Sequence, residues 1–298
     1  MIKQPPYLKK GDKIAIVCPA KKLPKSIAYG ISILESWGLT VIQGKTVTGA
    51  YHQFSGSDEE RTADLQQFLN DQSIKAIIAG RGGYGTIRII DELDFTAFSQ
   101  NPKWLIGFSD ITVLLSHAFA KLNTQSIHGQ MPYTFEESTP EAIESLRVAL
   151  FGENLDYQCK TEGGREGKAE GILIGGNLSL LIAVEGSVSA MDFKDKILFL
   201  EEVGEHEYSI DRMMRMLKRA GKLAQLKGLI IGAFNEVGEE SIPFGQTPEE
   251  VIWELVKEYD YPMCFNFPCG HIDDNRAMVL GKSVSLSINK QSVDLKFL

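Results

Sequence analysis

The chain has 298 residues, of which 43% are hydrophobic and 23% are charged, and its formal net charge at pH 7 is -8. These values are typical of a globular protein with about two domains. The negative charge argues against binding of nucleic acid or an anionic membrane through a broad surface of the protein. No stretch reaches the roughly 20 apolar residues of a membrane-spanning helix, and the N-terminus carries no apolar run of signal-peptide length. We therefore expect a cytoplasmic protein.

The first half of the chain alternates predicted strands with predicted helices. Lys13–Cys18 is a continuous apolar run, typical of a parallel strand covered on both faces. Ser57-Asp-Glu-Glu60 is a capping box that opens a helix. Further strands are predicted at residues 39–42, 75–79 and 104–108, and helices at 25–37, 57–69, 86–93 and 110–122. This alternation predicts an α/β fold with an open parallel sheet and helices on both faces.

A polar, glycine-rich stretch precedes the second half. We assign residues 1–151 to an N-terminal domain, 152–168 to a linker, and 169–298 to a smaller C-terminal α/β domain. In this second half, strands are predicted at residues 171–174, 197–202, 228–234 and 263–267, with helices at 209–220 and from Thr247 onward. Apolar residues alternate in 283–288 and 292–297, which predicts a terminal hairpin with one solvent-exposed face.

The four cysteines are too scattered to indicate a metal site or a disulfide scaffold. They stand at positions 18, 159, 264 and 269, without C-x-x-C spacing. We therefore expect reduced thiols, in agreement with a cytoplasmic protein.

Ser109 lies where the predicted strand 104–108 runs straight into a predicted helix. A serine at such a joint has its hydroxyl lifted clear of the backbone, and the following amide points toward an oxyanion in the helix mouth. The G-x-S-x-G pattern of this nucleophile elbow is half present, because Gly107 fits and Ile111 replaces the second glycine. A serine before a helix is also an ordinary N-cap, so the residues alone leave both interpretations open.

The segment Gly80-Arg-Gly-Gly-Tyr-Gly85 also allows two interpretations. It matches G-x-G-x-x-G between a predicted strand and a predicted helix, and Asp110 follows 25 residues after Gly85, so it fits a dinucleotide-binding protein. Its place after the third strand and the long interval to the acid count against a dinucleotide. At the carboxyl edge of a parallel sheet, a glycine turn beside Ser109 aims N–H groups at an acyl oxygen equally well.

A serine nucleophile needs a base, and the base needs an orienting acid. Among the five histidines, His271 follows a predicted strand and a turn, where catalytic residues concentrate, and it ranks first. His128, after a short strand, ranks second. Glu201 and Glu202 end an apolar strand, where buried carboxylates need partners. Alternation along the strand predicts that only one of them points into the site, although both facing solvent at the strand terminus is an open alternative.

Together these motifs resemble the LD-carboxypeptidase family of serine peptidases over nearly the whole chain, and within it the murein tetrapeptide carboxypeptidases. The resemblance rests on the order and spacing of several segments, namely Ile14–Ala20, Arg81–Gly85, Gly107–Asp110, Gly175–Leu178, Leu198–Glu202 with Glu205, and Gly270-His271.

The resemblance implies a catalytic triad of Ser109, Glu201 and His271, with the amides of Gly83 and Asp110 as the oxyanion hole. It also implies a flavodoxin-like N-terminal domain, a site at the junction with the smaller C-terminal domain, and a homodimer, with no metal and no cofactor. The implied reaction removes the terminal D-alanine of a muropeptide tetrapeptide by cutting an L,D bond during cell-wall recycling.

A second branch of the same family inactivates microcin-type peptidyl-nucleotide antibiotics, and its members carry a longer loop with aromatic residues. Here residues 234–247 are acidic and modest in length, which favours the peptidoglycan branch. A carboxypeptidase also has to bind the free carboxylate of its substrate, so a cation is expected close to Ser109. Arg81 is our candidate because it opens the glycine turn, although a salt bridge within the fold would explain this residue equally well.

Overall fold

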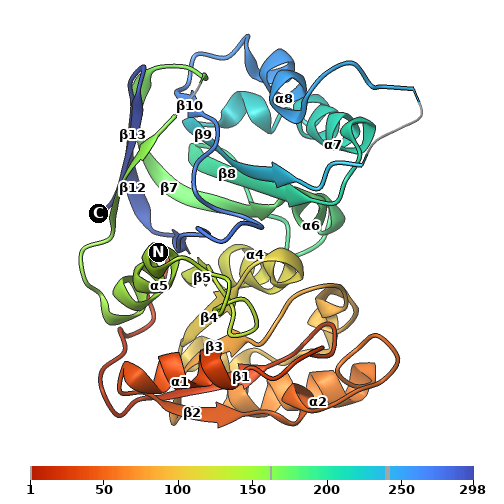
Figure 1. Cartoon of the computed structure of the whole chain (residues 1–298), viewed down its shortest axis with the longest axis vertical. Coiled ribbons are helices and arrows are strands. Elements are labelled where there is room, and N and C mark those ends of the chain that lie inside the picture. The colour runs from red at the N-terminus through yellow and green to blue at the C-terminus, as the bar shows by residue number, and fades with distance from the viewer. Residues whose placement is uncertain (1, 162, 239–241) are drawn as a thin grey trace.

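The computed structural model describes residues 2–161, 163–238 and 242–298. The N-terminal half, at the bottom of Figure 1, is built on a sheet whose strands are β1 (Lys13–Val17), β2 (Thr40–Gln43), β3 (Ile74–Ala79), β4 (Trp104–Gly107), β5 (Ser126–His128) and β11 (Met278–Leu280). The spatial order is β11-β5-β4-β3-β1-β2, and all neighbours except β11 and β5 run parallel. Without β11, this is the flavodoxin-like order. The predicted parallel α/β sheet is confirmed.

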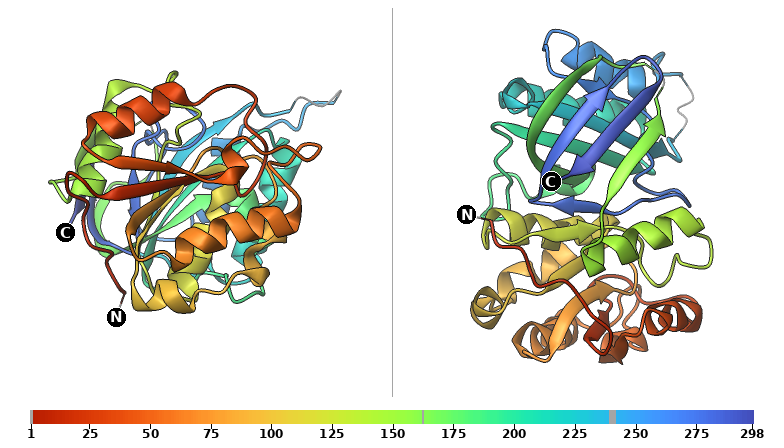
Figure 2. Two further views of the ribbon diagram at one scale, coloured as in Figure 1. Left: turned by 90° about the horizontal axis from the view of Figure 1, so that it is seen from below. Right: turned by 90° about the vertical axis from the view of Figure 1, so that its left-hand side faces the viewer.

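Helices cover both faces of the first sheet, as the view from below in Figure 2 shows. They are α1 (Ala28–Ser36), α2 (Asp58–Asn70), α3 (Thr96–Gln100), α4 (Thr112–Ala120) and α5 (Pro140–Phe151), with the short 3-10 helices η1 (Lys45–Val47), η2 (Thr86–Arg88), η3 (Ile90–Glu92) and η4 (Ser109–Ile111). The predicted capping box opens α2, since Ser57 and Glu60 each accept a hydrogen bond from the other's backbone N–H. Residues 86–93 were expected as a helix but form two 3-10 turns.

The C-terminal half is built on a second sheet, at the top of Figure 1. Its strands are β6 (Asp156–Lys160), β7 (Gly167–Asn177), β8 (Lys196–Val203), β9 (Gly228–Asn235), β10 (Met263–Cys264), β12 (Ser283–Ile288) and β13 (Ser292–Phe297). In the order β10-β9-β8-β7-β12-β13-β6, the first four run parallel and the remaining pairings are antiparallel. The helices are α6 (Leu178–Ala183), α7 (Glu207–Arg219) and α8 (Pro248–Val256), with the 3-10 helix η5 (Leu223–Gln225). The predicted terminal hairpin is confirmed as β12 and β13.

The stretch 152–168, predicted to be a linker, contains regular structure. Strand β6 occupies its middle and pairs with β13, and β7 begins at Gly167. The C-terminal half also contributes one strand to the first sheet, because β11 pairs with β5. A further difference is β10, predicted to reach Phe267, which ends at Cys264 because Asn266 turns the backbone to a φ of 57°.

The carboxyl ends of strands from both sheets meet at the junction between the halves. At the end of β7, Asn177 N donates a hydrogen bond of 3.2 Å to Thr112 Oγ1 at the start of α4. Gly176 allows this close approach, because a Cβ there would lie 2.6 Å from Thr112 Cγ2. None of the helices in the described part of the chain has the length and apolar character needed to cross a membrane.

Candidate active site

Ser109 lies on a sharp turn between β4 and α4. Its φ is +62°, a left-handed conformation that is uncommon for a residue with a side chain. Gly107 is needed for this turn, because its φ is +156° and a Cβ on it would lie 2.9 Å from Ile111 Cγ2. Ile111, which replaces the second glycine of the G-x-S-x-G pattern, therefore packs against Gly107, the first glycine. A strained serine on a strand-to-helix turn is the geometry of a nucleophile elbow.

His271 and Glu201 form a close pair at the same junction. His271 Nδ1 lies 2.7 Å from Glu201 Oε2, and Glu201 at the end of β8 is fully buried. Gly270 makes room for the carboxylate, because a Cβ on it would lie 2.8 Å from Glu201 Cβ. Burial lowers the pKa of His271, but the charge and hydrogen bond of Glu201 raise it more, so the pKa lies above its usual value. The imidazole of His271 is therefore held by a buried carboxylate, as the predicted roles of base and orienting acid require.

Phe108 connects this pair to the serine. Its ring lies 4.9 Å from the ring of His271, centroid to centroid, and Ser109 follows it directly. Among the described residues, however, no hydrogen bond joins Ser109 Oγ to His271. Catalytic hydrogen bonds are often long in ligand-free structures and shorten only in the substrate complex. The triad of Ser109, Glu201 and His271 therefore stays a prediction. The contact between Glu201 and His271 is formed, and Ser109 lies on the strained turn that the prediction requires.

Glu202 is buried as well, so the alternative that both carboxylates face solvent is wrong. Its two oxygens accept hydrogen bonds from Asn177 Nδ2 at 2.8 Å, Ser179 N at 2.7 Å and Val203 N at 2.9 Å. These donors lie at the first turn of α6 and on β8 itself. Burial nevertheless raises the pKa of Glu202 above its usual value. The two neighbouring carboxylates thus have different partners, and it is Glu201 that contacts His271.

His128, the second candidate base, is enclosed by protein. Its side chain is fully buried between the rings of Phe108 and Phe199, at centroid distances of 5.8 and 4.8 Å. Burial lowers the pKa of His128 to about 4. Its Nε2 lies 3.3 Å from Asn275 Oδ1, which also accepts a hydrogen bond of 2.8 Å from Gly270 N. Because it is enclosed, His128 cannot reach a substrate. Through Asn275 it supports the loop that carries His271.

The glycine turn between β3 and η2 lies against the serine. A Cβ on Gly82 would be 3.0 Å from Ser109 Cβ and 3.3 Å from its Oγ. The Asp110 carboxylate accepts hydrogen bonds from Gly85 N at 3.3 Å and Thr86 N at 2.8 Å. Among the described residues, neither the Gly83 nor the Asp110 amide donates to a protein acceptor. The two predicted oxyanion donors are therefore available, and their role stays a prediction.

This geometry argues against the dinucleotide interpretation. The turn leads into η2, a 3-10 helix of three residues, instead of the α-helix whose N-terminus would bind a pyrophosphate. The Asp110 carboxylate occupies the amides of Gly85 and Thr86, so it repels a phosphate there and is not free to bind a ribose.

Arg81 opens the turn but is already engaged within the protein. Its guanidinium donates a hydrogen bond of 2.9 Å to Lys22 O and lies 5.0 Å from the centroid of the Tyr133 ring. Arg81 thus joins the loop after β1 to the loop after β5. Its contact with a substrate carboxylate stays a prediction.

A cavity of about 170 Å³ opens beside His271, between Phe108, the loop at 130–138 and the Ile272-Asp273 segment. In the part of the chain that the structure describes, no group of three or more histidine, cysteine or carboxylate side chains is arranged to hold a metal ion. The arrangement can support proton transfer and nucleophilic attack by protein groups.

Comparison with known families agrees with this geometry. Residues 14–129 match the LD-carboxypeptidase N-terminal domain, and residues 170–286 match the LD-carboxypeptidase C-terminal domain. A probable murein peptide carboxypeptidase of Bacillus subtilis (strain 168) is 31% identical over 291 residues, which cover 95% of this chain and 91% of that protein. The chain belongs to the LD-carboxypeptidase family.

Two further comparisons span nearly the full length of both partners. The crystal structure of muramoyltetrapeptide carboxypeptidase from Oxalobacter formigenes has a TM-score of 0.87 at 26% identity and covers 96% of this chain and 98% of that one. The Microcin C7 self-immunity protein MccF of Escherichia coli is 24% identical over 325 residues, 96% of this chain and 93% of that protein. The family resemblance found in the sequence is thereby confirmed.

Proposed function

We propose that this chain is a serine-type carboxypeptidase that removes the terminal D-alanine of a muropeptide tetrapeptide by cutting an L,D bond. The observation that carries the proposal is the contact of 2.7 Å between His271 Nδ1 and the buried Glu201 carboxylate. An imidazole fixed in this way, beside a serine on a strained elbow, suits acyl transfer. The names of the relatives from Bacillus subtilis and Oxalobacter formigenes support a muropeptide as the substrate.

In the proposed mechanism, Ser109 Oγ attacks the carbonyl carbon before the D-alanine while His271 Nε2 takes its proton. Glu201 stabilises the resulting imidazolium through Nδ1, and the amides of Gly83 and Asp110 bind the oxyanion. The tetrahedral intermediate collapses when His271 returns the proton to the leaving amine, and D-alanine departs. A water then attacks the acyl-serine, with His271 again as the base, and releases the tripeptide.

The proposal also includes the cellular compartment in which the reaction takes place. Composition and cysteine usage support a cytoplasmic protein, in which the enzyme would act on muropeptides returned from the cell wall. The homodimer implied by the family resemblance belongs to the proposal too, and so does catalysis without a metal or a cofactor.

The second candidate is hydrolysis of a microcin-type peptidyl-nucleotide, which the similarity to MccF supports. The loop that favoured the peptidoglycan branch falls partly outside the described residues, because residues 239–241 belong to it. The discriminating experiment compares kcat/KM for three compounds: the muramoyl tetrapeptide, its epimer with a terminal L-alanine, and an aminoacyl-sulfamoyl adenosine. We expect the L,D tetrapeptide to be the best substrate. A higher value for the nucleotide compound would transfer the assignment to the second branch.

The remaining alternative, a dinucleotide-binding protein, has its own test. Titration with NAD and NADP, followed by calorimetry, is expected to show no binding, because the Asp110 carboxylate occupies the amides of the glycine turn. Binding at micromolar concentration would revive that alternative.

A further inference from the structure

A carboxypeptidase of the proposed kind has to recognise the free carboxylate of the residue that it releases. That carboxylate lies one residue beyond the scissile carbonyl, at most about 3.6 Å along the chain. A cation that binds it must therefore stand close to the amides that hold the oxyanion.

The side chain of Lys21 lies across the glycine turn at this point. A Cβ on Gly83 would be 2.5 Å from Lys21 Cδ, 2.7 Å from its Cγ and 3.0 Å from its Cβ, so the aliphatic stem rests directly on Gly83. The preceding Gly82 is in the same kind of contact with Ser109, at 3.0 Å from its Cβ. Two consecutive residues of the turn therefore separate the lysine stem from the nucleophile.

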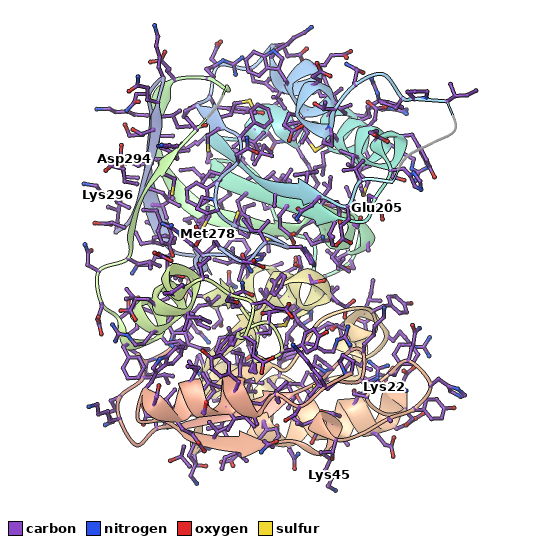
Figure 3. All side chains as sticks on the ribbon, in the orientation of Figure 1. Lys22, Lys45, Glu205, Met278, Asp294 and Lys296 are labelled. Atoms are coloured by element: carbon purple, nitrogen blue, oxygen red, sulfur yellow. The ribbon has the colours of Figure 1, made fainter. Side chains whose placement is uncertain are left out.

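The backbone that carries Lys21 is held in place on two sides. Lys21 forms an antiparallel bridge with Phe54, and Lys22 N donates a hydrogen bond of 3.1 Å to Gln53 O. From the other side, Arg81 binds Lys22 O at 2.9 Å. Figure 3 labels the neighbouring Lys22, which lies on the right of the lower, N-terminal half. The half-buried Lys21 side chain is thus presented from a fixed loop.

Three other cations near the turn are engaged by protein groups. Arg61 and Arg88 share the carboxylate of Asp58, and Arg81 is engaged by a backbone carbonyl and an aromatic ring. Within the described residues, the Lys21 ammonium has neither a hydrogen bond nor an ion pair. A cation without a partner, whose stem is packed beside the oxyanion donors, can bind an anion without breaking a contact of the fold.

We propose that the ammonium of Lys21 binds the free terminal carboxylate of the substrate and so makes the enzyme a carboxypeptidase. This inference rests on the proposed function. It assigns the task to Lys21 in place of Arg81, whose contacts favour a role in joining two loops.

The test compares the free-acid tetrapeptide with its C-terminal amide in the wild type, Lys21→Met and Lys21→Arg, with Lys22→Met as the matched control. Lys21→Met keeps the stem on Gly83 and removes the charge. We expect it to lower kcat/KM for the acid by roughly 10- to 100-fold, as for the loss of a charge-assisted contact, with little change for the amide. Lys21→Arg should keep most of the preference for the acid, and Lys22→Met should keep all of it.

The outcomes separate the two proposals. An unchanged ratio of acid to amide turnover in Lys21→Met, in an otherwise active enzyme, overturns the assignment of Lys21 alone. A wild type that releases no D-alanine from the tetrapeptide overturns the proposed function and this inference with it. If Lys21→Met does not fold, as judged by circular dichroism, Lys21→Gln takes its place, and an unchanged ratio of acid to amide turnover in that folded variant overturns the assignment.

Discussion

Replacement of Glu201 by glutamine most clearly tests whether Glu201, and not its neighbour Glu202, is the proposed catalytic carboxylate. At the observed 2.7 Å between His271 Nδ1 and Glu201 Oε2, a carboxylate and an imidazolium attract each other by about 6 kcal/mol at an effective dielectric constant of about 20. Each ~1.36 kcal/mol is a factor of ten in rate, so the charge sets a ceiling of about 10⁴-fold. Because glutamine can keep one hydrogen bond, we expect Glu201→Gln to lower kcat by roughly 10²- to 10⁴-fold.

The pH dependence of kcat/KM gives a second test of the proposed role of Glu201. Glu201 raises the pKa of His271 against the opposing effect of burial. Neutral glutamine removes that rise, so the acidic limb of kcat/KM, which reports the free base, moves to lower pH. The fold should hold, because Glu201 Oε1 is buried without a partner and a neutral group costs less to bury. Steady-state kinetics between pH 4 and 8 and urea unfolding measure both effects.

Glu202→Gln is the matched control, with the opposite outcome. Its carboxylate accepts three hydrogen bonds that hold the first turn of α6, and an amide cannot accept all of them. We expect the free energy of unfolding to fall by about 1–3 kcal/mol, with kcat near that of the wild type while the protein stays folded. Equal losses of kcat in the two variants, or an acidic limb that does not move in Glu201→Gln, would refute the reasoning.

Three further predictions follow from the same geometry. Ser109→Ala and His271→Ala should each lower kcat by at least roughly 10³-fold, and the double variant should be hardly slower than either, because triad members act as a unit; additive losses would contradict this. The pKa of His128, lowered by burial to about 4, makes stability decline as pH falls from about 6.5 to about 4, by about 3 kcal/mol over that interval. His128→Gln should lack this part of the decline in urea unfolding, and parallel curves would show that His128 is not the cause. Arg81→Ala should slow the acid and the amide substrate alike, whereas selective loss on the acid would assign the carboxylate to Arg81 instead of Lys21.

The first sheet could be predicted because its strands are buried on both faces. Such strands read as uninterrupted apolar runs, and β4, for example, has all four residues buried. Helix α2 was signalled by its capping box. Helix α5 was missed, although Thr139 caps it by accepting from Ala142 N and Pro140 stands at its first turn. That signal was present in the sequence.

Other elements depend on partners that are distant in the chain. Strand β6 alternates between exposed and buried positions in a polar segment, and only its pairing with β13 makes it a strand. Strand β11 joins the first sheet from the other half of the chain, which no local pattern could indicate. Both cases reflect non-local pairing, for which periodicity within one segment is no guide.

The candidate site was accessible to sequence reasoning where chain geometry alone places a residue. Ser109 is placed by the strand-to-helix joint, and Glu201 by the end of β8. Position ranked His271 ahead of His128, but it could not show that Phe108 and Phe199 enclose His128. Lys21 belongs to no motif, and only its packing on Gly83 brings it to attention.

The central claim is tested most directly by mass spectrometry of the muramoyl tetrapeptide incubated with the wild type and with Ser109→Ala. We predict that the wild type converts the tetrapeptide to the tripeptide and free D-alanine, and that Ser109→Ala leaves it intact. A tetrapeptide left unchanged by the wild type, or tripeptide formed at the same rate by Ser109→Ala, would contradict the account.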